Sequence, residues 1–128
     1  MSAASLRARY LGDAVSTAAP QQLLVMLYDR LALDLERGQI ALAEQDHATA
    51  NAQLQHAQDI VLELLSSLQV DAWEGGPRLA ALYRWLHAEL VAANLKKDVN
   101  RVASCVQVVE PLRDAWRQAA ESLATAAS

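Results

Sequence analysis

The side chains that could carry chemistry in this chain are three histidines and one cysteine, namely His47, His56, His87 and Cys105. Glu44 and His47 have the Glu-x-x-His spacing found where helical bundles hold two metal ions between carboxylates. Such a centre needs a second copy of the motif and two further carboxylates that point inward. The chain has one copy, which straddles a predicted turn, and we find no Glu on an apolar stripe. We therefore expect no metal or other cofactor, and we expect His47 to lie on the surface.

His56 suggests a different activity, because it lies in the middle of an expected helix beside Asp59 and Glu63. A phosphorelay histidine on a four-helix bundle would look similar, so this function stays open as the less favoured alternative. Such modules usually place a Lys and a Gly just after the histidine, whereas this chain continues with Ala57 and Gln58.

The remaining groups predict no catalysis. Cys105 neighbours an apolar stripe, and a free cysteine in that position is typically a small core residue. The Gly75–Gly76 pair lacks the Gly-x-Gly-x-x-Gly pattern, or the Lys-Ser/Thr context, that lets a glycine-rich loop hold phosphate. We expect a protein that is not an enzyme.

Composition favours one soluble helical domain. The chain has 128 residues, of which 53% are hydrophobic and 20% charged, and it contains no Phe, so its core must use Leu, Val and Ala. The net charge of −4 comes without a basic stripe, so nucleic acid is not an expected partner. A single cysteine fits a reducing compartment, and no apolar run is long enough to cross a membrane. These features predict a cytoplasmic location.

Apolar periodicity divides the chain into an arm and four helices. Leucines and other apolar residues recur at steps of three, four and seven, which is typical of one buried helix face. We expect an arm that is flexible or a short helix over residues 1–19 and a bundle over 20–124. Its helices are expected at about 20–43, 47–69, 77–96 and 98–123.

Residues that favour the first turn of a helix indicate where these helices begin. Pro20 and Pro77 suit a first helical turn, where an N–H has no partner, and Asp46 and Asp98 suit N-caps. Pro111 lies inside the last helical pattern and is expected to kink that helix. Four stripes joined by short connections predict an all-α, antiparallel up-down-up-down bundle.

Some apolar residues are not needed by the core of such a bundle. They lie in the arm, beside the main stripe of the first helix, in the loop and on the third helix: Tyr10, Leu11, Val15, Leu23, Leu33, Trp73 and Trp85. Single exposed apolar residues are normal in soluble proteins. Grooves between helices can also bind amphipathic helices of a partner. The periodicity leaves both interpretations open.

Five motifs in the same order and at similar separations resemble the family of flagellar secretion chaperones called FliS. The resemblance covers nearly the whole chain, with departures at Ala19, Ala92 and Pro111. The five segments are Tyr10 with 14–20 (Ala-Val-Ser-Thr-Ala-Ala-Pro), 24–29 (Leu-Val-Met-Leu-Tyr-Asp), Gly75-Gly76 with Leu82-Tyr83, 92–98 (Ala-Ala-Asn-Leu-Lys-Lys-Asp) and 112–116 (Leu-Arg-Asp-Ala-Trp).

The resemblance implies a cytoplasmic export chaperone. Members of the family bind the disordered C-terminal segment of flagellin, which prevents premature polymerisation and keeps the subunit competent for type III export. The resemblance leaves open whether the flagellar export gate or other flagellar regulators also bind, and whether the free protein is a monomer or a dimer. A helical adaptor or secretion chaperone for another client stays the main alternative.

The resemblance also implies site residues. Tyr10, Leu11 and Val15 would line or cover the client groove, and four residues of the first helix would support its wall: Leu24, Leu27, Tyr28 and Leu31. The plain alternative for Leu27 and Leu31 is a role in the core. Asn94 and Asp98 would either bind client backbone or shape the turn between the third and fourth helices, and we favour the turn.

Overall fold

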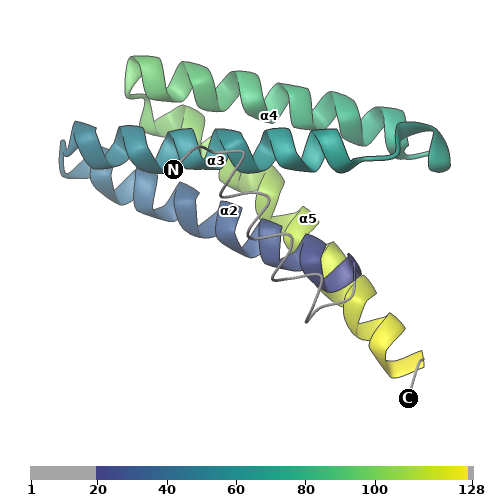
Figure 1. Cartoon of the computed structure of the whole chain (residues 1–128). Coiled ribbons are helices and arrows are strands. Elements are labelled where there is room, and N and C mark those ends of the chain that lie inside the picture. The colour runs from purple at the N-terminus through teal and green to yellow at the C-terminus, as the bar shows by residue number, and fades with distance from the viewer. Residues whose placement is uncertain (1–19, 127–128) are drawn as a thin grey trace, which may run out of the picture.

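The computed structural model describes residues 20–126, and these residues form four long helices. The helices are α2 (Pro20–Ala43), α3 (His47–Ser67), α4 (Gly76–Lys96) and α5 (Val99–Ala126), with a short 3-10 turn, η1 (Val70–Ala72), between α3 and α4. α3 ends at Ser67 and not at residue 69, and α5 continues to Ala126. The all-α bundle expected from the sequence is confirmed (Figure 1).

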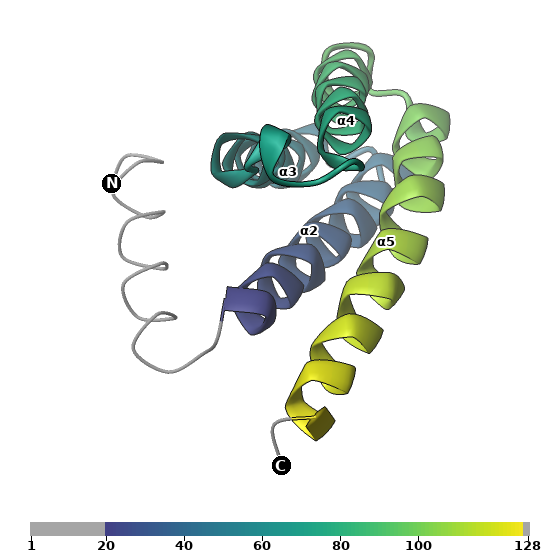
Figure 2. The ribbon, with the colours of Figure 1, turned by 90° about the vertical axis from the view of Figure 1, so that its right-hand side faces the viewer.

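The helices are arranged as two antiparallel pairs. α2 packs against both α3 and α5, α3 also packs against α4, and α4 and α5 share a smaller interface. The α2–α5 pair crosses the α3–α4 pair at an angle. As a result, the start of α2 and the second half of α5 diverge from α3 and α4 (Figures 1 and 2).

Three residues show how the helices begin, end or continue. The Asp46 carboxylate accepts a hydrogen bond from the Thr49 backbone N–H at 3.1 Å. Thr49 lowers the pKa of Asp46, first through its side chain and second through this backbone N–H. Lys97 takes a left-handed conformation, with φ of 50°, at the end of α4. Pro111 lies inside α5, and the helix continues beyond it to Ala126.

Close packing in the connection between α3 and α4 requires a glycine at position 76. A Cβ at Gly76 would overlap the carbonyl oxygen of Val70 in η1, and a Cβ at Gly75 would overlap the ring of Trp73. Gly76 therefore lets η1 fold back against the start of α4, whereas at Gly75 the exposed ring of Trp73 could move aside.

The core is built from leucines, with smaller residues between them. Leu31, Leu35, Leu54, Leu86 and Leu90 are fully buried, and all four helices contribute to the same cluster. The expectation that no Glu faces inward is wrong for Glu63 of α3, which is 6% exposed. Because α3 packs against both α2 and α4, it buries a wider arc than a single apolar stripe.

Two tyrosines meet inside this core. The hydroxyls of Tyr28 from α2 and Tyr83 from α4 are 2.7 Å apart, and both side chains are buried. Desolvation raises the pKa of Tyr28, and desolvation together with the neighbouring Tyr28 raises the pKa of Tyr83. Both hydroxyls therefore stay protonated at neutral pH, and their hydrogen bond links helices at opposite corners of the bundle.

A double-mutant cycle on the two tyrosines tests this link. Tyr28→Phe or Tyr83→Phe alone leaves one buried hydroxyl without its partner, so each should lower the free energy of unfolding by about 1–2 kcal/mol. The double variant should lose less than the sum of the two. Urea unfolding of the four proteins measures this coupling, and strictly additive losses would contradict the bond.

Candidate partner-binding surfaces

The diverging end of the bundle presents apolar side chains that the core covers only in part. Leu24 of α2 and Leu112 and Trp116 of α5 pack against the core and are half-buried, whereas Leu123, further along α5, is exposed. The indole N–H of Trp116 is buried and lies near the Tyr28 hydroxyl without reaching hydrogen-bond geometry. Helical surface that continues past the core is the kind of surface a partner helix can bind.

The motif residues of α2 lie mainly in the core beneath the diverging end of the bundle. Leu27, Tyr28 and Leu31 are buried in the core, and Leu24 is half-buried beside them. They can influence a partner by holding the shape of α2, and their role in binding stays a prediction. The three arm residues of the expected site, Tyr10, Leu11 and Val15, lie outside the described residues.

Asn94 joins the end of α4 to α3. Its side-chain amide donates to Oδ1 of Asn51 at 2.8 Å, and its own Oδ1 accepts from Nζ of Lys97 at 2.6 Å. Asn94 is buried, so these bonds satisfy a polar group that would otherwise be costly to bury.

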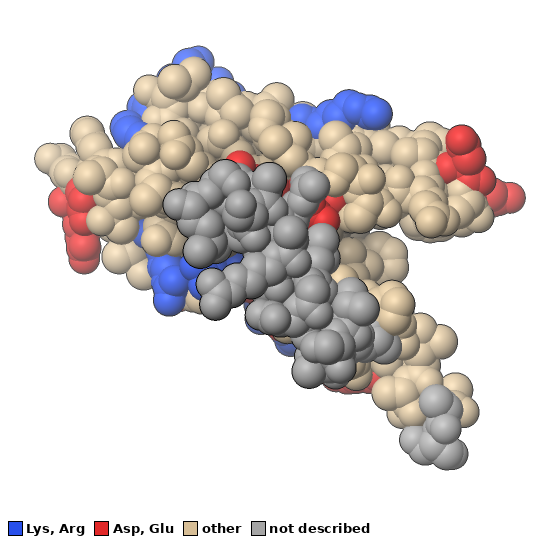
Figure 3. Space-filling view, in the orientation of Figure 1, with Lys and Arg blue, Asp and Glu red and all other residues tan. Residues whose placement is uncertain are grey.

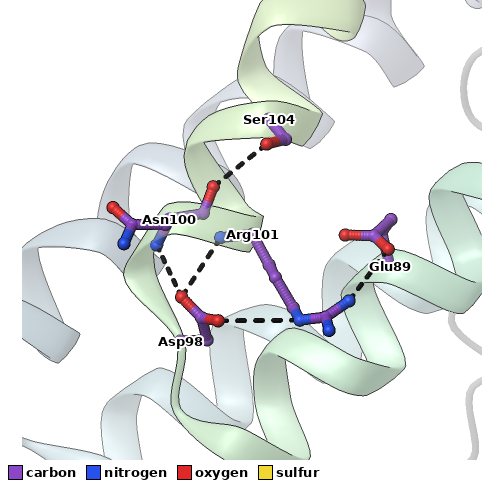
Figure 4. Close-up of polar contacts among 5 residues, drawn as sticks. All are labelled: Glu89, Asp98, Asn100, Arg101 and Ser104. Atoms are coloured by element: carbon purple, nitrogen blue, oxygen red, sulfur yellow. Dashed lines mark hydrogen bonds and ion pairs between the residues drawn. The ribbon is translucent and has the colours of Figure 1, made fainter.

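Asp98 caps the start of α5. Oδ1 of Asp98 accepts from the backbone N–H groups of Asn100 at 2.9 Å and Arg101 at 3.4 Å. The Arg101 side chain then reaches Glu89 of α4 at 3.0 Å and Oδ2 of Asp98 at 3.6 Å (Figure 4). Asn94 and Asp98 therefore both stabilise the turn between α4 and α5, and contact of either residue with a client stays a prediction.

A buried carboxylate between α2 and α3 is a feature that sequence reasoning missed. Asp34 is fully buried, and its two oxygens accept hydrogen bonds from Nε of Arg30 at 3.0 Å and from Nδ1 of His56. The signal was available, because Asp34 lies between Leu31 and Leu35 on the apolar stripe of α2. A carboxylate in that position needs partners, and His56 is one of them.

A second charged cluster fastens α5 to α2. Oδ1 of Asp29 accepts hydrogen bonds from Nε of Arg113 at 2.6 Å and from Nη2 of Arg117 at 2.9 Å. Arg113 also lies 3.5 Å from Glu110, and the carboxylate of Asp29 raises the pKa of Arg113. The two helices therefore stay together where they leave α3 and α4.

A groove of about 380 Å³ lies between α2 and α5, beside this cluster. Its lining combines apolar and charged side chains: Asp29, Ala32, Leu33, Glu36, Gln39, Val106, Glu110 and Arg113.

On the face drawn in Figure 3, Lys and Arg lie in small separate groups, and Asp and Glu gather mainly at the two ends.

The groups that could do chemistry are dispersed. Within residues 20–126, no three His, Cys, Asp or Glu side chains come together as a metal site would require. Cys105 is buried, and desolvation together with Glu89 raises the pKa of its thiol to about 12. The thiol is therefore neutral at pH 7.

None of the described helices is long and apolar enough to span a bilayer.

Comparison with known proteins identifies relatives of this chain. The family model described as flagellar protein FliS matches residues 2–123. The flagellar secretion chaperone FliS of Bacillus subtilis (strain 168) is 33% identical over 113 residues, which cover 88% of this chain and 84% of the relative. The Escherichia coli (strain K12) protein of the same name is 30% identical over 108 residues, covering 83% and 79%.

A solved structure, a crystal structure of a flagellar chaperone from bacteria, has the same fold. It superposes with a TM-score of 0.74 at 22% identity, covering 92% of this chain and 97% of the other. The chain belongs to the FliS family of flagellar secretion chaperones.

Replacing His56 tests its structural role. His56→Ala leaves the buried Asp34 carboxylate with Arg30 as its remaining partner, so it should lower the free energy of unfolding by roughly 1.5–3 kcal/mol. His47→Ala is the matched control, because His47 is exposed at the start of α3 and its loss should change stability by less than about 0.5 kcal/mol. Equal effects of the two variants in urea unfolding would contradict the role of His56.

Proposed function

We propose that this chain is a cytoplasmic export chaperone that binds the disordered C-terminal segment of flagellin. Binding covers surface that would otherwise polymerise and keeps the subunit competent for type III export through the flagellum. Membership of the FliS family supports this function, because the relatives are named flagellar secretion chaperones.

The structural observation that carries the proposal is the divergence of the two helix pairs. α2 and α5 continue past the core with half-buried and exposed apolar residues, among them Leu24, Trp116 and Leu123. A disordered client that folds on binding can cover such an extended surface. It loses part of its interaction energy to ordering, so its affinity per unit area stays modest. That balance suits an escort that must release its client.

The N-terminal arm enters the proposal through Tyr10, Leu11 and Val15. We infer that these residues lie over part of the client site and are displaced when flagellin binds.

Calorimetry with two forms of flagellin tests the function. Full-length flagellin should bind, and flagellin that lacks its C-terminal segment should show no measurable heat, because the proposed contacts all come from that segment. Equal binding of both forms would mean that another part of flagellin is recognised. Absence of binding to both would point to another client.

Deleting residues 1–16 tests the arm. The shortened chain should keep its helical circular dichroism and its cooperative melting, while its affinity for full-length flagellin changes by about threefold or more, which is about 0.7 kcal/mol. A shortened chain that is unfolded would show that the arm is structural. A folded chain with unchanged affinity would show that the arm does not cover the site.

A further inference from the structure

The side of α4 that faces away from the core carries an apolar stripe with no partner among the described helices. Five residues form this stripe at alternating intervals of four and three, which places them along one side of a helix: Ala81, Trp85, Ala88, Ala92 and Leu95. Trp85 is 40% exposed and Leu95 is 80% exposed. At 1.5 Å per residue the stripe is about 21 Å long, which matches a bound helix of about four turns.

The core of the bundle does not use this stripe, which we call the outer face of α4. The opposite side of α4 is buried, and Leu79, Leu86 and Leu90 lie there with Tyr83. The contact of Tyr83 with Tyr28 places α4 and α2 at opposite corners of the bundle. The outer face therefore points away from α2 and from the diverging end of the bundle (Figure 2).

Positive charge borders the outer face on both sides. Arg78, Arg84 and Lys96 are exposed, and none of their side chains forms a hydrogen bond or an ion pair within residues 20–126. Arg78 and Lys96 are 18 residues apart, or about five full turns, so they lie on one border of the stripe, and Arg84 lies on the other. Groups of Lys and Arg are visible along the edge of the molecule formed by α4 (Figure 3).

Negative charge on α4 is scarce and already paired. Glu89 is the one acidic residue of this helix, and it lies 3.0 Å from Arg101 of α5. α4 thus has three Lys or Arg residues and one Glu, although the whole chain has a net charge of −4. The unpaired cations beside the stripe fit a partner that carries carboxylates.

We propose that the outer face of α4 is a second binding surface of this protein, and that it binds an acidic amphipathic helix of a partner protein. The apolar side of that helix covers Trp85 and Leu95, and the alanines of the stripe let the two helix backbones approach closely. Asp or Glu residues on the two borders of the partner helix pair with Arg84 on one side and with Arg78 and Lys96 on the other.

Charge and side-chain size favour this occupant over three others. A second copy of this chain would offer the same face, and a two-fold interface would bring like charges together. The segment 1–19 has Arg7 and Arg9 against Asp13, so it also lacks acidic charge. A membrane surface binds helices that insert large apolar side chains, whereas three of the five residues of this stripe are alanines.

Binding at the outer face is independent of the client that the chain carries. The face points away from the diverging end, so the client and the acidic helix can be bound at the same time (Figure 2). A protein that recognises the chaperone through α4 can therefore do so while the client surface is occupied.

Calorimetry of the full chain with synthetic peptides tests this surface. The probe is a helical peptide of about 21 residues, with Leu at alternating intervals of three and four and Glu on both borders. A second peptide has Lys in place of every Glu, and a third has the composition of the probe in an order that removes the spacing. The probe should bind, and the other two should bind at least about tenfold more weakly. Absence of probe binding, or equal binding of the probe and either control peptide, would overturn the proposal.

A pair of matched variants tests the location. R84E/L95D changes the outer face, and R37E/I40D makes the corresponding changes at an exposed arginine and an exposed isoleucine of α2, with the same effect on net charge. Circular dichroism and thermal melting establish that both variants are folded. R84E/L95D should bind the probe at least about tenfold more weakly than the wild type, and R37E/I40D should stay within about twofold. Equal losses in the two variants, or no loss in R84E/L95D, would contradict the assigned surface.

A milder variant tests the charge and leaves the apolar stripe intact. R84Q/K96Q removes two exposed cations, so it should weaken probe binding by about threefold at low salt and by less at about 1 M salt, where screening acts within about 3 Å. Wild-type affinity of this variant at low salt would overturn the charged contacts.

Three measurements cover the other occupants. A dimer in sedimentation that R84E/L95D dissociates would assign the face to a second copy. Binding to vesicles of phosphatidylglycerol and phosphatidylcholine that R84E/L95D abolishes would assign it to a membrane surface. Displacement of the probe by the isolated C-terminal segment of flagellin would assign it to the proposed client. Each of these results would overturn the proposal, whereas a monomer that ignores vesicles and binds the probe beside the flagellin segment would support it.

Discussion

Helix α2 has to bury side chains in two directions, and much of the structure follows from that constraint. It packs against α3 on one side and α5 on the other, so its buried surface is wider than the leucine stripe alone. Asp34 is drawn into the interior toward α3, where Arg30 and His56 satisfy it. On the side of α2 that faces α5, Asp29 accepts hydrogen bonds from Arg113 and Arg117. The polar groups of α2 thereby link this helix to both of its main neighbours, α3 and α5.

The fold could be predicted from the sequence because its signals are local. The leucine spacing predicted which face of each helix is buried, and Asp46 and Asp98 were predicted as caps by residue type alone. Both form the expected bonds to backbone N–H groups. The contacts that were missed join helices far apart in the sequence, such as Asp34 with His56 and Asp29 with Arg113. Periodicity identifies a helix face, but it does not identify the residue on the neighbouring helix.

The candidate site was less predictable for the same reason. The motif residues that carry the family resemblance in α2 and before α5 serve the architecture of the bundle: Leu27, Tyr28 and Leu31 fill the core, and Asn94 and Asp98 close a turn. The groove between α2 and α5 is lined by Asp29 and Arg113, which belong to two of the five motifs, but also by residues such as Glu36 and Val106, which belong to none of them. In this chain, the residues that identify the fold and the residues that face the solvent groove are largely different sets.

The position of Cys105 has a practical consequence for experiments on this protein. The one thiol of the chain lies in the core and is protonated at neutral pH, so reagents that modify surface thiolates react with it slowly. A cysteine introduced at an exposed position can therefore carry a fluorophore or a spin label while the native residue stays in place. The slow reaction of Cys105 itself records how often the packed interior opens to solvent.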